Sequence, residues 1–180
     1  MNFENINLND YDNDTPYPQI TSTEKDEKIL TDIIDLYTGP KSEFTALIQY
    51  IYQSFITKSN ENYIELSKIL ETLSNRKIRH LEILSQILMV QNVNPKFCKY
   101  IDNNYNICSS WSSNNVKYLT DVKEFIKSNI TLEKSILAKY NNILNNTTSE
   151  NIKEILTRII QDENSYLEIL NKILEIIENG

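Results

Sequence analysis

Glycine and proline are scarce in this sequence, whose 180 residues include two glycines and four prolines. Positions that favour tight turns are therefore few, whereas isoleucine, leucine, lysine, glutamate and asparagine are abundant. This composition predicts long helices, few tight turns and little or no sheet. The length fits one domain that is large enough to bury a hydrophobic core.

Excess positive charge and long apolar runs are also missing. The formal net charge is −7, which argues against binding to the phosphates of nucleic acids or to an anionic membrane surface. No apolar run approaches the roughly 20 residues that a membrane span requires. The first 14 residues are acidic and polar, unlike a signal peptide. We therefore expect a cytoplasmic protein that binds neither nucleic acid nor membrane.

Cysteine and histidine are too few for several common kinds of site. The sequence has two cysteines, Cys98 and Cys108, and one histidine, His80. The two cysteines lack further residues at the spacing of a zinc-binding pattern. We expect Cys98 and Cys108 to be reduced thiols rather than a disulfide. A glycine-rich phosphate loop and a second histidine for a catalytic triad are both lacking. Hydrolase and nucleotide-binding functions are therefore disfavoured.

Apolar residues recur at helical spacing in four long segments. A shorter amphipathic segment, residues 28–38, precedes them and ends at a Gly-Pro pair. Polar turns separate the first two long segments from each other and the last two from each other. The four long segments are residues 42–56, 63–93, 116–144 and 150–178.

The middle connection, residues 95–115, is long, rich in asparagine and serine, and without clear periodicity. Two helical hairpins joined by one long crossover predict an all-α protein, a four-helix bundle of the ferritin-like order. Residues 1–27 are polar and predict an extended or disordered N-terminal arm. We expect the bundle domain, including the short leading helix, to cover residues 28–180.

Charged residues interrupt the apolar face of each long segment. Lys77 and His80 lie in the middle of the second apolar stripe, and Glu43, Glu133 and Glu163 lie on the stripes of the other three segments. An unpaired buried ammonium costs several kcal/mol, as an order of magnitude. Carboxylates that converge inside a bundle repel unless a cation sits among them. That cation is either a metal ion or the ammonium of Lys77, and the pattern is typical of di-iron and di-manganese carboxylate bundles.

Tyrosine is the most abundant aromatic residue, with 11 copies. Tyr50, Tyr140 and Tyr166 fall on the inward-facing stripes. They could be redox-active neighbours of a metal, but we favour hydrogen-bonded core tyrosines. Trp111, in the crossover, is expected to anchor that connection onto the bundle.

Several short motifs occur in order along most of the chain. They are Pro-Tyr-Pro at 16–18, Tyr-x-Gly-Pro-x-Ser-Glu-Phe-Thr-Ala at 37–46, Gln-Tyr-Ile-Tyr-Gln at 49–53, His-Leu-Glu-Ile-Leu at 80–84, Trp-Ser at 111–112, Glu133 with Tyr140, and Arg-Ile-Ile-x-Asp-Glu at 158–163. With these motifs the chain resembles ferritin-like proteins of the manganese-catalase and rubrerythrin type. The resemblance is greatest to the spore-coat-associated branch in spore-forming bacteria.

The resemblance implies a ligand set that this chain keeps in part. Glu43 matches the ligand of the first bundle helix and Glu133 that of the third. His80 matches the histidine of the second helix, and Glu163 matches the glutamate of the fourth. These four residues are the candidate metal ligands that the resemblance assigns.

Two of the six ligand positions implied by the resemblance have changed. Lys77 stands where the second helix would carry a bridging glutamate, and Tyr166 stands where the fourth would carry a histidine. An ammonium beside two metal ions would repel both. We therefore expect no ordinary dinuclear site, but a vestigial or mononuclear one.

Two arrangements remain open. In the first, Lys77 replaces the metal and pairs with two or three of the glutamates, while His80 and Tyr166 complete the hydrogen bonds. Negative charge then remains in excess, so one carboxyl is protonated or His80 is charged. In the second, Glu43, His80 and Glu163 hold one iron, manganese or zinc ion, and Lys77 fills the second position.

The leading functional hypothesis is a non-catalytic structural or interaction protein with a degenerate di-metal site, and the resemblance links it to the spore or to stress. The alternative is a metal-binding, peroxide-consuming oxidoreductase with a mononuclear or remodelled centre. A third hypothesis is a plain helical scaffold. We expect a homo-oligomer, a dimer or larger, and allow for another protein partner.

Overall fold

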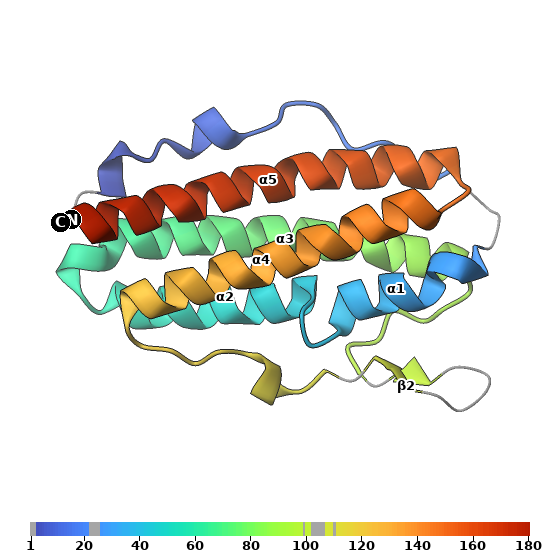
Figure 1. Cartoon of the computed structure of the whole chain (residues 1–180), viewed down its shortest axis with the longest axis horizontal. Helices are drawn as coiled ribbons and strands as arrows, with labels where there is room; N and C mark the ends of the chain where they lie inside the picture. The colour runs from blue at the N-terminus through green and yellow to red at the C-terminus, as the bar shows by residue number, and fades with distance from the viewer. Residues whose placement is uncertain (1–2, 22–25, 99, 102–106, 110) are drawn as a thin grey trace.

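Five α-helices make up most of the protein in the computed structural model, which describes residues 3–21, 26–98, 100–101, 107–109 and 111–180 (Figure 1). They are α1 (Glu27–Thr38), α2 (Glu43–Lys58), α3 (Ile64–Val90), α4 (Val122–Asn146) and α5 (Glu150–Asn179). The helices lie roughly along one axis; α3 and α4 run in one direction, and α1, α2 and α5 run in the other.

Helices α2 and α3 form one hairpin, and α4 and α5 form the other; α1 lies beside the bundle in line with α2 (Figure 1). The apolar faces of all five helices meet in one core. The prediction of an all-α, ferritin-like four-helix bundle with a short leading helix is therefore confirmed. The domain boundary at residue 27 stays a prediction.

Side-chain caps explain where three helices begin. Ser42 accepts a hydrogen bond from the Thr45 amide at the start of α2, and Ser149 accepts one from the Ile152 amide at the start of α5. A hydroxyl at this position satisfies an amide that has no partner within the helix. Asp121 does the same for α4 by accepting from the Glu124 amide.

Two helix ends differ from the sequence-based expectation by three residues or more. Helix α4 begins at Val122 rather than at residue 116, because the Asp121 cap stops it. Helix α3 ends at Val90 rather than at residue 93, because Asn92 adopts a left-handed φ of 59°. The amide of Val93 then donates to the Leu88 carbonyl, which closes the helix in a Schellman motif.

The crossover carries a small antiparallel pair of strands, β1 (Tyr100–Ile101) and β2 (Ile107–Ser109). Trp111 anchors it as predicted: its indole N–H donates to Thr45 Oγ1 over 3.0 Å, and its ring packs against Phe44. Cys98 is exposed, whereas the side chain of Cys108 lies outside the described residues.

The N-terminal arm lies along α5 (Figure 1). It contains two short 3-10 helices, η1 (Phe3–Asn5) and η2 (Leu8–Tyr11), which contact α3 and α5 respectively. Phe3 and Ile6 are buried in the common core. Among the described residues, no helix has the length and apolar character needed to cross a membrane.

Candidate functional site

The five charged residues that the sequence placed on apolar faces meet at one point inside the bundle. Lys77 and His80 come from α3, Glu43 from the first turn of α2, Glu133 from α4 and Glu163 from α5. All five are completely buried. Each helix thus places its polar side chain where the helical period predicted, among residues that are otherwise apolar.

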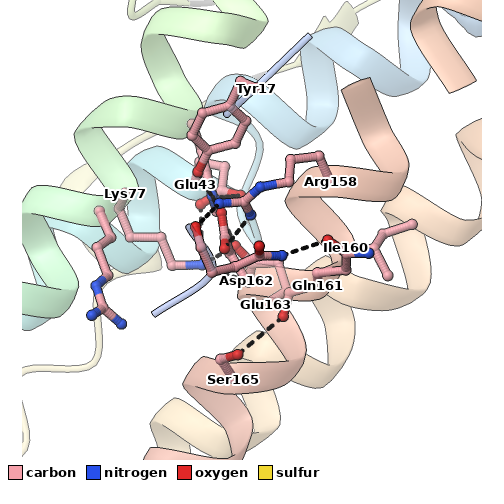
Figure 2. A network of polar contacts seen from close by, with 12 residues as sticks. Tyr17, Glu43, Lys77, Arg158, Ile160, Gln161, Asp162, Glu163 and Ser165 are labelled. Atoms are coloured by element: carbon pink, nitrogen blue, oxygen red, sulfur yellow. Dashed lines mark hydrogen bonds and ion pairs between the residues drawn. The ribbon is translucent and has the colours of Figure 1, made fainter. Parts of the chain in front are cut away.

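Lys77 lies at the centre of this cluster. Its Nζ is 2.7 Å from Glu133 Oε2, 2.7 Å from Glu163 Oε2 and 3.1 Å from Glu43 Oε2. Figure 2 shows the side chains of Lys77 and Glu163 meeting. Burial disfavours the ammonium, but the three carboxylates outweigh burial and raise the pKa of Lys77. Lys77 is therefore a permanent cation shared by three helices.

His80 faces carboxylates with both ring nitrogens. Nδ1 is 2.8 Å from Glu163 Oε1 and 3.3 Å from Glu43 Oε1, and Nε2 is 3.4 Å from Asp162 Oδ2. Burial lowers the pKa of His80, but Glu43 and the hydrogen bonds to Asp162 and Glu163 raise it well above its usual value. At 2.8 Å two lone pairs would repel, so a proton lies between Nδ1 and Glu163 Oε1.

The glutamates differ in charge state. Burial raises the pKa of Glu43, but Lys77 and His80 outweigh burial and lower it to about 2. For Glu163, burial and the carboxylates of Glu43 and Glu133 outweigh Lys77 and raise the pKa well above its usual value. Glu43 is therefore ionised, and Glu163 is the carboxyl that shares a proton with His80.

Three tyrosines surround the charged cluster: two donate hydrogen bonds to its glutamates, and the third packs its ring against it. Tyr50 donates its hydroxyl to Glu133 Oε1, and Tyr140 donates to Glu43 Oε1 over 2.5 Å. Burial raises the pKa of both phenols, which keeps them neutral donors. Tyr166 was also expected to complete the hydrogen bonds. It instead presents its ring, which stacks on His80 at 5.7 Å and lies 5.1 Å from Lys77 Nζ.

Asp162 and Tyr17 belong to the site but were not predicted. Asp162 accepts hydrogen bonds from Tyr17 and Arg158 and faces His80 (Figure 2). Burial raises the pKa of Asp162, but the hydrogen bonds from His80, Tyr17 and Arg158 lower it overall. Tyr17 and Asp162 both lie in motifs that carry the family resemblance, and this was the one signal that could have identified them.

A second polar cluster lies between α2 and α4. Gln49 Nε2 donates to Asn129 Oδ1 over 2.7 Å, and Asn129 Nδ2 donates to Gln53 Oε1 over the same distance. Gln49 Oε1 accepts from the amide of Lys117, which ties the crossover to the bundle. All three amide side chains are buried and carry no charge.

The charged cluster also contains atoms that suit one metal ion. Glu43, His80 and Glu163 each offer a ligand atom, and these atoms lie within 4.8 Å of one another. Two carboxylates and one histidine form a donor set that binds several divalent metals. The same Glu163 carboxylate, however, accepts from Lys77 through both oxygens, at 2.8 and 2.7 Å.

Solved structures with the same fold include metalloproteins. The structure aligns with the manganese catalase KatB of Anabaena at a TM-score of 0.74 and 17% identity, over 93% of this chain and 80% of that one. It aligns with the bacterioferritin BfrA of Mycobacterium tuberculosis at a TM-score of 0.70 and 18% identity, over 87% and 89% of the two chains. At these identities the likeness establishes the shared fold.

Sequence comparison gives the family. An uncharacterized protein of Acanthamoeba polyphaga mimivirus is 24% identical over 141 residues, which are 77% of this chain and 9% of that protein. The family model described as Rubrerythrin matches residues 37–174, which include the whole of the charged cluster. Since that match covers most of the sequence, this chain belongs to the rubrerythrin family and to the ferritin-like di-metal carboxylate superfamily.

Proposed function

We propose that this protein is a ferritin-like bundle whose di-metal site is degenerate, and that it acts as a structural or interaction component rather than as a redox enzyme. The observation that carries this proposal is the position of Lys77. Its ammonium contacts carboxylates from α2, α4 and α5 at 2.7 to 3.1 Å. It thereby supplies internally the positive charge that bound metal ions supply in a dinuclear carboxylate site.

The donor set does not fit two metal ions beside this ammonium. A dication bound to Glu133 and Glu163 would have to displace Lys77 Nζ, which is 2.7 Å from both carboxylates. Moving a buried ammonium away from its carboxylates leaves it without compensation, at a cost of several kcal/mol. A dinuclear centre is therefore disfavoured by charge as well as by the loss of ligands at positions 77 and 166.

Metal content and turnover together test the proposal. Protein purified without chelators should contain no stoichiometric iron, manganese or zinc when analysed by mass spectrometry of the elements. After incubation with these metals, its catalase and peroxidase activity should not exceed that of the free ions. Two metal ions per chain, or turnover well above the free metal, would overturn the proposal.

A second candidate function rests on the three ligand atoms of Glu43, His80 and Glu163. In this alternative, one iron, manganese or zinc ion binds there, Lys77 fills the other position, and the protein is a peroxide-consuming oxidoreductase. Their separation of at most 4.8 Å supports it. One metal ion per chain that is lost in Glu43→Gln, together with peroxide turnover, is the result that would favour this candidate.

We also propose that the protein is a homo-oligomer, a dimer or larger, and that it works in the cytoplasm with an association with the spore. Large apolar side chains such as Phe55 and Tyr118 are at least half exposed, which supports self-association. Sedimentation equilibrium should give a mass of at least two chains; a monomer across the accessible concentrations would contradict it. Detection in isolated spores would test the location.

A further inference from the structure

The arm crosses the bundle directly outside the charged cluster. Arg158 of α5 donates from Nε to the carbonyl of Thr15 over 2.6 Å and from Nη2 to the carbonyl of Asn13 over 2.8 Å. Asn13 also donates to Gln161 over 2.6 Å. Arg76 of α3 pairs with Asp12 on the other side. The arm segment is thus held between α3 and α5, and two of these four contacts use its backbone carbonyls.

Within the described parts of the arm, residues 3–21 and 26–27, Tyr17 is the one residue whose side chain reaches the cluster. Its ring meets the His80 ring edge-on at 6.2 Å. The Arg158 guanidinium lies 4.5 Å from the centre of the Tyr17 ring and that of Arg79 lies 5.4 Å from it, while the hydroxyl donates to Asp162 (Figure 2). Tyr17 is therefore seated among residues of α3 and α5 beside the histidine.

A cavity of about 280 Å³ lies on the other side of this tyrosine. The arm and helices α3 and α5 form its walls, with Tyr17, Asp162 and Tyr166 nearest the cluster. Tyr17 and Tyr166 line the cavity and both also contact His80. One layer of side chains, Tyr17, Asp162 and Tyr166, therefore separates the cavity from the buried imidazole, and Tyr17 is the member that the arm supplies.

The α5 members of this layer and its arm member differ in how firmly they are held. Tyr166 belongs to the middle of α5 and is 2% exposed. Tyr17 depends on the contacts of the arm, whose hydrogen bonds from the charged Arg158 contribute about 1.5–3 kcal/mol each. Segments held in this way open locally at a lower free energy than the core helices unfold.

We propose that the N-terminal arm is a strap that closes the charged cluster, and that the ring of Tyr17 is its gate. When the strap lifts, small polar molecules and ions pass from the cavity to His80 while the four-helix bundle stays folded. The proposal concerns access to the cluster and holds whether or not a metal binds there.

The single histidine provides the test. Diethyl pyrocarbonate acylates accessible imidazoles in their neutral form, so wild type and variants are compared at one pH, and mass spectrometry of peptides can follow modification of His80. In the full-length protein Tyr17→Ala should raise the modification rate by about tenfold or more, as expected when a local opening step is removed. Tyr17→Phe keeps the ring but loses the bond to Asp162, and should stay within about threefold of wild type.

Tyr63→Ala is the matched control. Tyr63 packs against the arm through Phe3 at a ring distance of 6.3 Å. It lies 17 residues before His80, so it is about 25 Å away along α3. This variant loosens the arm at its other end and should leave the rate near that of wild type.

The denaturant dependence of the rate separates local opening from global unfolding. Modification through the gate should be nearly independent of low urea concentrations, whereas modification through global unfolding rises with urea. Equal rates in Tyr17→Ala and wild type would overturn the proposal. So would a Tyr17→Phe or Tyr63→Ala variant as fast as Tyr17→Ala, or a Tyr17→Ala rate that follows global unfolding.

Discussion

Two buried polar clusters lie in the same bundle, and they are satisfied in different ways. The amides of Gln49, Gln53 and Asn129 pair among themselves and with the crossover. The cluster around Lys77 and His80 must also balance charge, because it holds three glutamates at zero exposure. A neutral network requires only hydrogen bonds. In a charged network, removal of one member also leaves the buried charges of its partners uncompensated.

The largest effect should follow when the central charge is reversed. Lys77→Glu with Tyr166→His places a fourth carboxylate in the cluster and puts a glutamate and a histidine where the family resemblance implies ligands. Without metal, the variant should lose more than about 5 kcal/mol of unfolding free energy, because like charges then meet without a cation. Metal should restore about 4 kcal/mol at a thousandfold excess over its Kd.

Urea unfolding with and without manganese or iron measures both the loss of unfolding free energy and its recovery with metal. Uptake of two metal ions per chain would accompany the recovery. If the variant takes up no metal, the assignment of ligand positions to the four helices is wrong.

Removing the central charge without reversing it should have the next largest effect. Lys77→Met keeps most of the side-chain volume but leaves three carboxylates without their ammonium. We expect a loss of about 3–5 kcal/mol, measured by urea unfolding at neutral pH. A loss below 1 kcal/mol would mean that the carboxylates are neutral and that the ion pairs contribute little.

Acid should affect the charged cluster and leave the amide cluster unchanged. The Glu43 pKa is lowered to about 2 in the folded protein. A group with a lowered folded-state pKa contributes stability that is present above its unfolded pKa, near 4.5, and that is lost as the pH falls toward 2. The contribution is about 3 kcal/mol, because each pKa unit corresponds to about 1.4 kcal/mol.

Urea unfolding curves measured between about pH 4.5 and pH 2 test whether the stability that Glu43 contributes is lost in acid. Glu43→Gln should be less stable than wild type at neutral pH and should show a flatter acid limb. An Asn129 variant should follow the wild-type slope, since it changes no titratable group. Parallel acid limbs in wild type and Glu43→Gln would contradict the assigned charge of Glu43.

The smallest effect should come from the amide cluster. Asn129→Leu removes one member at similar volume and leaves the buried amides of Gln49 and Gln53 without this partner. We expect a loss of about 1–3 kcal/mol in urea unfolding, which is the usual cost of unsatisfied neutral groups. A loss as large as that of Lys77→Met would remove the distinction between the two clusters.

Most of the bundle could be predicted from the sequence, because its signals are local. Helical periodicity gave the four long helices, and Ser42 and Ser149 are caps that act on amides three residues away. The start of α4 was misplaced because Val116 is apolar and buried without being helical. Burial alone therefore does not distinguish a packed loop from a helix.

The candidate site could be predicted in part, because helical periodicity also shows which side chains face the bundle centre. Lys77, His80 and the glutamates interrupt apolar stripes, and a polar residue on such a stripe points to the bundle centre. Asp162 precedes Glu163 and lies off the main stripe, so its contact with His80 depends on how α3 and α5 pack. The place of Tyr17 depends on the docking of an arm that has no helical period.

By itself, the amino-acid sequence determined which side chains enter the bundle, including a lysine on an otherwise apolar stripe, since this depends on residue type and helical period. Tertiary structure alone decided which carboxylates that lysine meets, which carboxylates face the ring nitrogens of His80, and that the Tyr17 ring lies beside that histidine. These depend on distances of a few ångströms between elements far apart in the chain, and no local rule specifies such distances.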